Sequence, residues 1–226
     1  MNKQNASWLL VLVVALLTLV AACAETTTAE RSGAVVKTNA PTPAAIEFKE
    51  DMRELWTEHV VWTRDYIVAT LNDRPEAIAL SDRLMKNQEH IGKAVGEYYG
   101  ADAGTQLTTL LKAHITGAVR VVDAAKANDK PALKVASENW SANAIEIADF
   151  LSKANPNWPR ATLVDLMKEH LSTTTDEVTA RLKKDWNADI KAFDKVYDHI
   201  LMMSDALSAG IIKQFPDRFD AAASAK

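Results

Sequence analysis

Three histidines stand at the same position of three similar stretches of sequence. His59, His114 and His170 close the pentapeptides LWTEH, LLKAH and LMKEH. Imidazole nitrogens are common ligands of zinc and copper, and three histidines leave one coordination position open for water or a substrate. A histidine on an apolar helix face is also frequently a hydrogen-bonded core residue. The pattern therefore predicts either a shared ligand site or a repeated core position.

A second polar position recurs in the same three copies, occupied by Asn87, Asn143 and His199. If each copy is an antiparallel helical hairpin, each of these residues lies opposite one first-helix histidine. An asparagine amide offers both a donor and an acceptor to a buried imidazole, so repeated His–Asn pairs are one interpretation. In the other interpretation, the three histidines and His199 converge on a zinc or copper ion, and the two asparagines orient the imidazoles by hydrogen bonds.

Tryptophans accompany these positions. Trp56 and Trp62 bracket His59, and Trp62 and Trp140 are candidates for contact with the same pocket. Packing in the core is the more usual role of aromatic residues at helical spacing. The positions of the tryptophans are compatible with both a ligand pocket and an aromatic core.

Methionines add soft sulfur atoms to the candidate ligands. Met167, Met202 and Met203 suit Cu(I), although methionine usually fills gaps in a core. The HExxH and CxxC motifs that mark many metal sites do not occur in the chain. His90 has no counterpart in the other two copies, and we expect it at the surface.

The repeat has a period of 56 residues. Asp73, Asp129 and Asp185 are spaced at this interval, and each is expected at the start of a helix, where its carboxylate accepts backbone N–H bonds. The distance from histidine to aspartate is one residue shorter in the first copy, so one residue is missing there. Helical periodicity is expected over 44–72, 75–99, 103–127, 131–154, 159–183 and 186–214. The predicted fold is all-α, a six-helix bundle of three related hairpins.

The second helix of each hairpin is predicted to have one apolar face. The matching positions are Leu84, Trp140 and Val196, then Ile91, Ile147 and Met203, and then Val95, Leu151 and Leu207.

The N-terminal residues predict export and attachment to a lipid. Residues 1–22 combine a lysine near the start with a short apolar run that ends in small residues, which is typical of a signal peptide. The sequence Val20-Ala21-Ala22-Cys23 resembles the lipobox of bacterial lipoproteins, and this resemblance implies cleavage before Cys23 and its diacylation. The remaining organisation is predicted as a flexible tether at 23–43, a helical-bundle domain at 44–220 and a disordered tail at 221–226.

Charge argues against a nucleic acid as the partner. The chain has 26 basic and 30 acidic residues and a formal net charge of −4, and loss of the leader would remove Lys3. Binding to phosphates needs a basic face instead. Gly-rich phosphate loops, the GxSxG elbow and paired ExxH motifs do not occur. An enzymatic function is therefore not favoured by the sequence.

Longer stretches resemble a family of uncharacterised bacterial helical proteins. These stretches are LWTEHVVWTRDYI, LLKAHI, NWSANAIEIADFL, NPNWP, LMKEHL and SDALSAGIIKQFP, and they span most of the chain from Leu55 to Phe219. Some members of that family carry transferase or kinase labels, but these residues contain no motif for such chemistry. The resemblance implies the helical fold. His59, His114 and His170 lie within the matching stretches, and His199 lies outside them.

These observations favour a non-enzymatic lipoprotein of the cell envelope with a helical binding or scaffolding domain. Its expected partners are the membrane, through Cys23, and a protein or small ligand in the envelope. In a host with two membranes, the alanine after Cys23 resembles the signal for sorting to the outer membrane. The alternative is a zinc- or copper-binding protein that uses the repeated histidines, with hydrolytic or redox chemistry as an extension.

Overall fold

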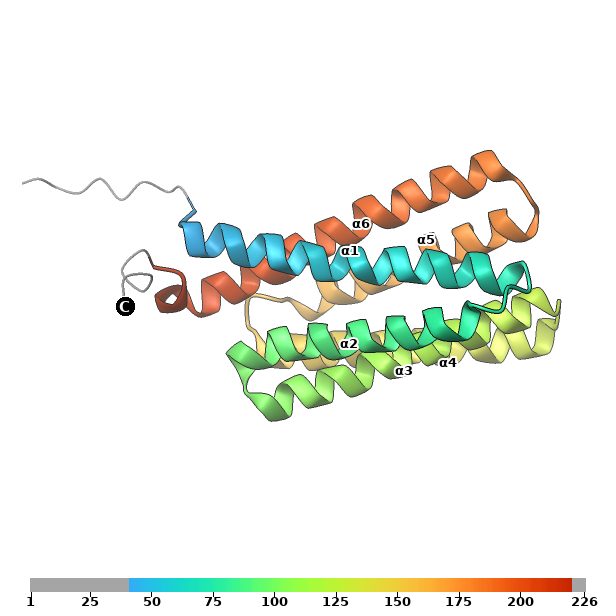
Figure 1. Cartoon of the computed structure of the whole chain (residues 1–226). Coiled ribbons are helices and arrows are strands. Elements are labelled where there is room, and N and C mark those ends of the chain that lie inside the picture. Colours follow the sequence, from blue (N-terminus) through green and yellow to red (C-terminus); the bar gives the residue numbers. More distant parts are fainter. Residues whose placement is uncertain (1–40, 221–226) are drawn as a thin grey trace, which may run out of the picture. The chain divides into compact units, whose positions relative to one another are not determined.

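Each segment with predicted helical periodicity forms a helix. The computed structural model describes residues 41–220, so the predicted signal peptide, Cys23, most of the predicted tether and the predicted tail at 221–226 lie outside the described residues. The helices in Figure 1 are α1 (Pro43–Leu71), α2 (Ala77–Tyr99), α3 (Ala101–Lys126), α4 (Lys130–Ala154), α5 (Arg160–Leu182) and α6 (Trp186–Gln214), followed by the 3-10 turn η1 (Pro216–Arg218). Residues 41–220 contain no strand, and the predicted all-α class is confirmed.

The six helices form a closed ring. Each helix packs against the next one in the chain, and α6 packs back against α1. The turns within the three hairpins lie at one end of the bundle, on the right in Figure 1, and the connections between hairpins lie at the other end. The first helix of the ring, α1, also contacts α3 and α5. Closure around one axis brings equivalent positions of the hairpins together, which a row of hairpins would not do.

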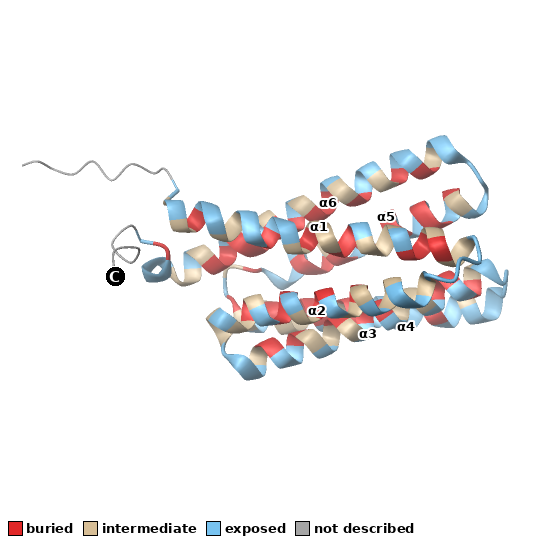
Figure 2. Cartoon of the chain, in the orientation of Figure 1, coloured by how far each residue is buried: buried red, intermediate tan, exposed pale blue. Residues whose placement is uncertain are grey.

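Inward-facing residues of the three hairpins make the core, as the buried positions in Figure 2 show. All nine residues predicted for the apolar faces of α2, α4 and α6 are buried, and all but Leu84 belong to the main hydrophobic core. Burial of such a face is the main source of stability for a helix in water. None of the helices within residues 41–220 has the length and hydropathy needed to span a bilayer.

The helices α2 and α3 meet at small residues. A Cβ atom on Gly104 would lie 2.9 Å from the Cα of Gly96 and 2.7 Å from the carbonyl oxygen of Gly92. Backbone atoms occupy both places, so no side chain could move aside to make room. The glycines therefore set how closely this pair of helices packs.

Two of the three predicted aspartate caps are present. Asp129 caps α4 and accepts a hydrogen bond of 3.0 Å from the backbone N–H of Ala132. Asp185 caps α6 and accepts one of 3.0 Å from Ala188. The prediction is wrong for Asp73, which lies in the turn before α2 and caps no helix.

The backbone of the turns explains this exception. Asp73, Asn128 and Lys184 all have φ between 53° and 57°, and in every hairpin the following N–H donates to an alanine carbonyl five residues earlier. The three residues are therefore equivalent. In the first hairpin the residue after this position is Arg74, which has no acceptor atom and cannot cap. The helix α2 starts later, after Glu76, and its first turn has no side-chain cap.

Candidate functional site

The three first-helix histidines meet inside the bundle. His170 on α5 lies in the middle, with ring centroids 5.7 Å from His59 on α1 and 5.8 Å from His114 on α3. The ring of His199 on α6 stacks on that of His170, with the centroids 6.3 Å apart. All four side chains are buried. Ring closure therefore produces the convergence that the sequence could not decide.

A hydrogen bond to Asn143 fixes the tautomer of His114. The amide nitrogen of Asn143 donates to the carbonyl of Leu110 at 3.1 Å, so its oxygen faces the imidazole. The Nδ1–H of His114 donates to that oxygen at 2.9 Å. In the neutral ring Nε2 then carries a lone pair. This predicted His–Asn pair is confirmed.

The predicted pair between His59 and Asn87 is wrong. The side chain opposite His59 is Gln88, whose amide nitrogen lies 3.3 Å from His59 Nδ1. Gln88 also donates to the Asn87 side-chain oxygen at 3.0 Å. The Asn87 oxygen therefore accepts from Gln88, whereas the equivalent oxygen of Asn143 in the second hairpin accepts from His114. Position 88 holds alanine and isoleucine in the other copies (Ala144 and Ile200), so the repeat pattern alone did not indicate this interaction.

The second polar position nevertheless makes one hydrogen bond that all three hairpins share. Its side chain donates to the backbone carbonyl four residues before the first-helix histidine: Asn87 to Leu55 at 3.0 Å, Asn143 to Leu110 at 3.1 Å and His199 Nε2 to Leu166 at 2.9 Å. These bonds join the two helices of each hairpin at the same level and fix their register.

Two imidazole nitrogens lack a partner. Nε2 of His114 and Nδ1 of His170 are fully buried, and neither has a hydrogen-bond partner among residues 41–220. The Nε2–H of His199 donates to the Leu166 carbonyl. The third hairpin has histidine where the others have asparagine, so no side-chain amide at this position can bond to the His170 imidazole. Buried polar atoms in proteins nearly always have a partner. Eight other buried side-chain atoms within residues 41–220 also lack one, so a bound species is one explanation for the two nitrogens.

Burial keeps these imidazoles neutral. It lowers the pKa of His59 to about 3, helped by the positive charge that a protonated His114 would carry. Burial also lowers the pKa of His114 to about 4, although its bond to Asn143 opposes the shift. The pKa of His170 lies well below its ordinary value, because of burial first and then its histidine neighbours. Neutral imidazoles are the form that binds metal ions.

A small apolar cavity adjoins the histidines. Its volume is about 30 Å³, which is enough for one or two waters or a single ion. His59, His114 and His170 line it together with Met52, Met167, Met203, Trp56 and Trp158. Among the described residues that line it, none is aspartate or glutamate. The site thus offers neutral nitrogen and sulfur atoms inside a hydrocarbon wall.

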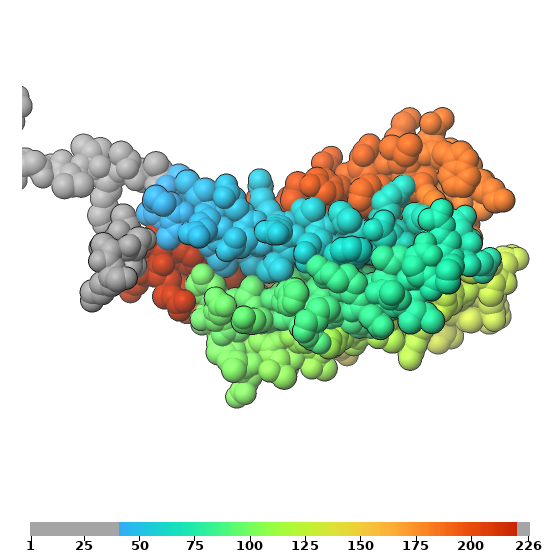
Figure 3. Space-filling view, in the orientation of Figure 1, coloured from blue at the N-terminus to red at the C-terminus, as the bar shows by residue number. Residues whose placement is uncertain are grey.

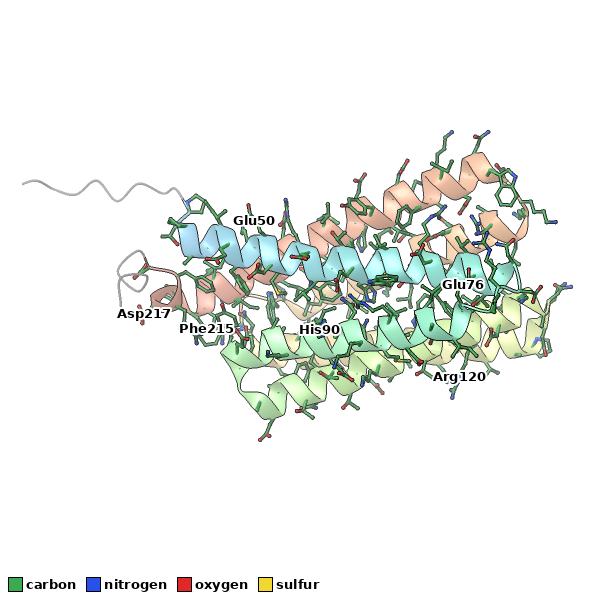
Figure 4. All side chains as sticks on the ribbon, viewed as in Figure 1. Glu50, Glu76, His90, Arg120, Phe215 and Asp217 are labelled. Carbon is green, nitrogen blue, oxygen red and sulfur yellow. The ribbon has the colours of Figure 1, made fainter. Side chains whose placement is uncertain are left out.

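The other predicted residues are placed differently. Trp140 packs against the His114 ring at 5.3 Å, whereas Trp62 lies half-buried under the guanidinium of Arg83, 4.9 Å from its ring centroid. Trp62 is therefore not part of the cavity wall; Trp56 takes that place. Met202 is 53% exposed and also outside the wall. His90 is exposed, as expected, and Figure 4 labels it between α1 and α2.

The arrangement of the side chains within residues 41–220 bears on the predicted metal site. Within the part of the chain that the structure describes, no group of three or more His, Cys, Asp or Glu side chains has the arrangement of a metal site. A zinc or copper site made of the four histidines remains a prediction. Any metal site in the core would need other donor atoms, and the methionine sulfurs are the ones present.

Sequence reasoning missed a buried ionic cluster between α1, α5 and α6. Arg64 donates to Glu177 at 2.6 Å and forms two bonds of 3.0 Å with Asp189. Arg181 donates to Asp189 at 2.7 Å. Burial raises the pKa of Glu177 to about 7, against the pull of the two arginines. These ion pairs join α1, α5 and α6, which indicates a structural role for the cluster.

The face formed by α1 and α2, seen in Figure 3, carries a surface groove of about 550 Å³. Its walls include three aromatic side chains, His90 and five carboxylates, which are Glu47, Asp51, Glu54, Glu58 and Glu97. Arg218 lies over the Tyr98 ring at 5.0 Å and already supplies a cation to this groove. The groove is open to solvent, unlike the histidine cavity.

The fold and the site together define a closed six-helix bundle with a histidine-lined core. A scan against protein-family models finds no match, and searches of curated proteins and of solved structures find none either.

Proposed function

We propose that this protein is a non-enzymatic binding protein of the cell envelope whose bundle core holds a small inorganic ligand. One observation carries the proposal: two buried imidazole nitrogens, on His114 and His170, lack a partner, and both side chains line one cavity. Leaving a buried polar atom unpaired costs about 1–3 kcal/mol. A bound species would remove that cost at both nitrogens.

The size of the cavity limits the ligand. Sites for organic ligands usually have volumes of about 300–1,000 Å³, whereas this cavity has about 30 Å³. An ion or a few-atom ligand fits such a space without movement of the helices. This size favours an inorganic ligand over an organic cofactor.

The chemistry of the site favours binding over catalysis. A general base works best when its pKa lies near the working pH, but burial lowers the pKa of His59 to about 3 and of His114 to about 4. The described wall also contains no carboxylate that could orient or assist an imidazole. The imidazoles are therefore suited to be ligands rather than proton carriers.

The envelope location rests on the leader and on Cys23, and fatty-acid labelling tests it. Cells grown with an alkyne-tagged fatty acid are expected to label the wild-type chain, because the predicted diacylation adds lipid at Cys23. The Cys23→Ser chain, which keeps the rest of the leader, should remain unlabelled. Equal labelling of both chains would exclude a lipid anchor at Cys23.

Native mass spectrometry tests for a ligand in the core. The wild-type protein, isolated from its own host in detergent, is expected to have a mass above that of its lipidated polypeptide, and acid should remove the difference. His114→Gln should lose the extra mass because it removes the free Nε2, whereas His90→Gln changes an exposed histidine and should keep it. A wild-type protein without extra mass contradicts the proposed function.

A further inference from the structure

We infer that the core ligand is a monovalent soft metal ion, Cu(I), bound by the imidazole nitrogens of His114 and His170 and by thioether sulfur from the cavity wall. This inference rests on the proposed function and names its ligand.

The donor atoms have the softness that Cu(I) requires. Met52, Met167 and Met203 come from α1, α5 and α6, and all three line the cavity that the histidines line. Thioether sulfur selects Cu(I) over harder ions, and imidazole binds copper readily. Methionine can also fill a core gap, but a filling role leaves the two imidazole nitrogens unexplained.

Charge balance separates Cu(I) from a divalent ion. None of the described wall residues is acidic, so an ion there would keep its full charge in apolar surroundings. The cost of burying a charge is large and grows with the square of that charge. Structural zinc sites meet this cost with thiolates or carboxylates and with four ligands. With neutral ligands only, burying a monovalent ion in this cavity costs less free energy than burying a divalent ion.

The spacing of the imidazoles fits a shared ion. With metal–nitrogen bonds of about 2 Å, two imidazoles on one ion have ring centroids roughly 5–6 Å apart. The centroids of His114 and His170 are 5.8 Å apart, and their planes differ by 26°. Asn143 holds the proton of His114 on Nδ1, which leaves Nε2 free to bind. A hydrogen bond of this kind commonly orients a metal-binding histidine.

A water molecule is the competing occupant. A water could donate hydrogen bonds to both nitrogens in a cavity of this size. Binding of added soft ions to the folded protein distinguishes an ion site from a water site. The chain contains one cysteine, Cys23, and a Cys23→Ser background removes the only thiol that would bind soft ions.

The test is a titration of the purified Cys23→Ser protein with Cu(I) under ascorbate, with Ag(I) as a redox-stable substitute and with Zn(II). Melting temperature reports binding to the folded state, and competition with a chromophoric Cu(I) chelator measures affinity. Cu(I) and Ag(I) are expected to raise the melting temperature at one equivalent. Met203→Leu should weaken Cu(I) binding by roughly tenfold or more, because it removes a sulfur at constant volume.

The matched controls use neighbours that do not line the cavity. Met202→Leu changes the adjacent, exposed methionine, and His90→Gln an exposed histidine; both should bind Cu(I) like the parent protein. His114→Gln should abolish binding, and Met203→Leu keeps the test valid if that variant fails to fold.

The alternative results are distinct. Stabilisation by Zn(II) but not by Cu(I) overturns the inference and leaves the proposed function intact. If a Met52→Leu/Met167→Leu/Met203→Leu protein binds Cu(I) as well as the Met202→Leu protein does, the inference is also overturned, because no sulfur of the cavity wall would then take part. If no ion binds and the isolated protein carries no extra mass, both the inference and the proposed function fail, and the cavity holds water.

Discussion

At pH 9, where Glu177 is ionised in the fold, replacement of Arg64 by methionine is expected to lower the free energy of unfolding by about 3–5 kcal/mol, because it leaves a buried charge without its partner. Arg64 provides the only ion pair of Glu177 among the described residues, and Glu177 has 1% of its side chain exposed. Asp189 would keep its bond to Arg181. For a domain of this size the loss corresponds to a fall in melting temperature of roughly 10 °C.

A surface ion pair between α1 and α6 provides the control. Arg53 on α1 bonds Asp205 on α6 through two nitrogens, but their side chains are 50% and 39% exposed. Exposed ion pairs add little to stability, so Arg53→Met should leave the melting temperature almost unchanged. Adding Glu177→Gln to Arg64→Met should recover part of the loss. Equal effects of Arg64→Met and Arg53→Met would show that burial of the cluster does not matter.

Acidification from pH 6.5 to pH 5 is expected to destabilise the domain far more than exposed histidines could. An unfolded histidine takes up a proton near pH 6.5, while His59, His114 and His170 stay neutral in the fold because burial lowers their pKa values. The unfolded chain therefore binds more protons below pH 6.5, and stability falls with falling pH. Three such groups remove up to about 4 kcal/mol per pH unit.

One buried group works in the opposite direction. Burial raises the pKa of Glu177 to about 7, so between its unfolded value of 4.5 and pH 7 the folded state binds the extra proton. This contribution grows as pH falls and offsets about 1.4 kcal/mol per unit. The net loss between pH 6.5 and pH 5 is then roughly 3 kcal/mol, a large part of the stability of an ordinary domain. Carboxylates of ordinary pKa change little in this window.

Urea unfolding at pH 7.5, 6.5, 5.75 and 5 measures the slope. His114→Gln should reduce it by about one proton, Glu177→Gln should steepen it, and His90→Gln should leave it unchanged because His90 is exposed. A free energy of unfolding that stays constant from pH 6.5 to pH 5 would mean that the three histidines take up protons in the folded state.

Local patterns in the sequence determined the helices and the equivalence of the hairpins. Helical periodicity predicted all six segments within two residues at each end, because helix hydrogen bonds and apolar faces depend on residues a few positions apart. The 56-residue repeat predicted the shared second position, and Asn87, Asn143 and His199 make the same carbonyl bond. It also predicted the Asn143–His114 pair.

Only the tertiary structure decided how the hairpins are arranged and what surrounds the histidines. Closure of α6 against α1 places three histidines from distant parts of the chain within 6 Å of a neighbouring ring, whereas a row of hairpins would have had the same sequence periodicity. Which side chains contact each other between helices also decided two further features. Gln88, and not the predicted Asn87, lies opposite His59, and Arg64 joins Glu177 and Asp189 in one cluster. Such contacts follow from packing in three dimensions, and the spacing of residues along one helix carries no record of them.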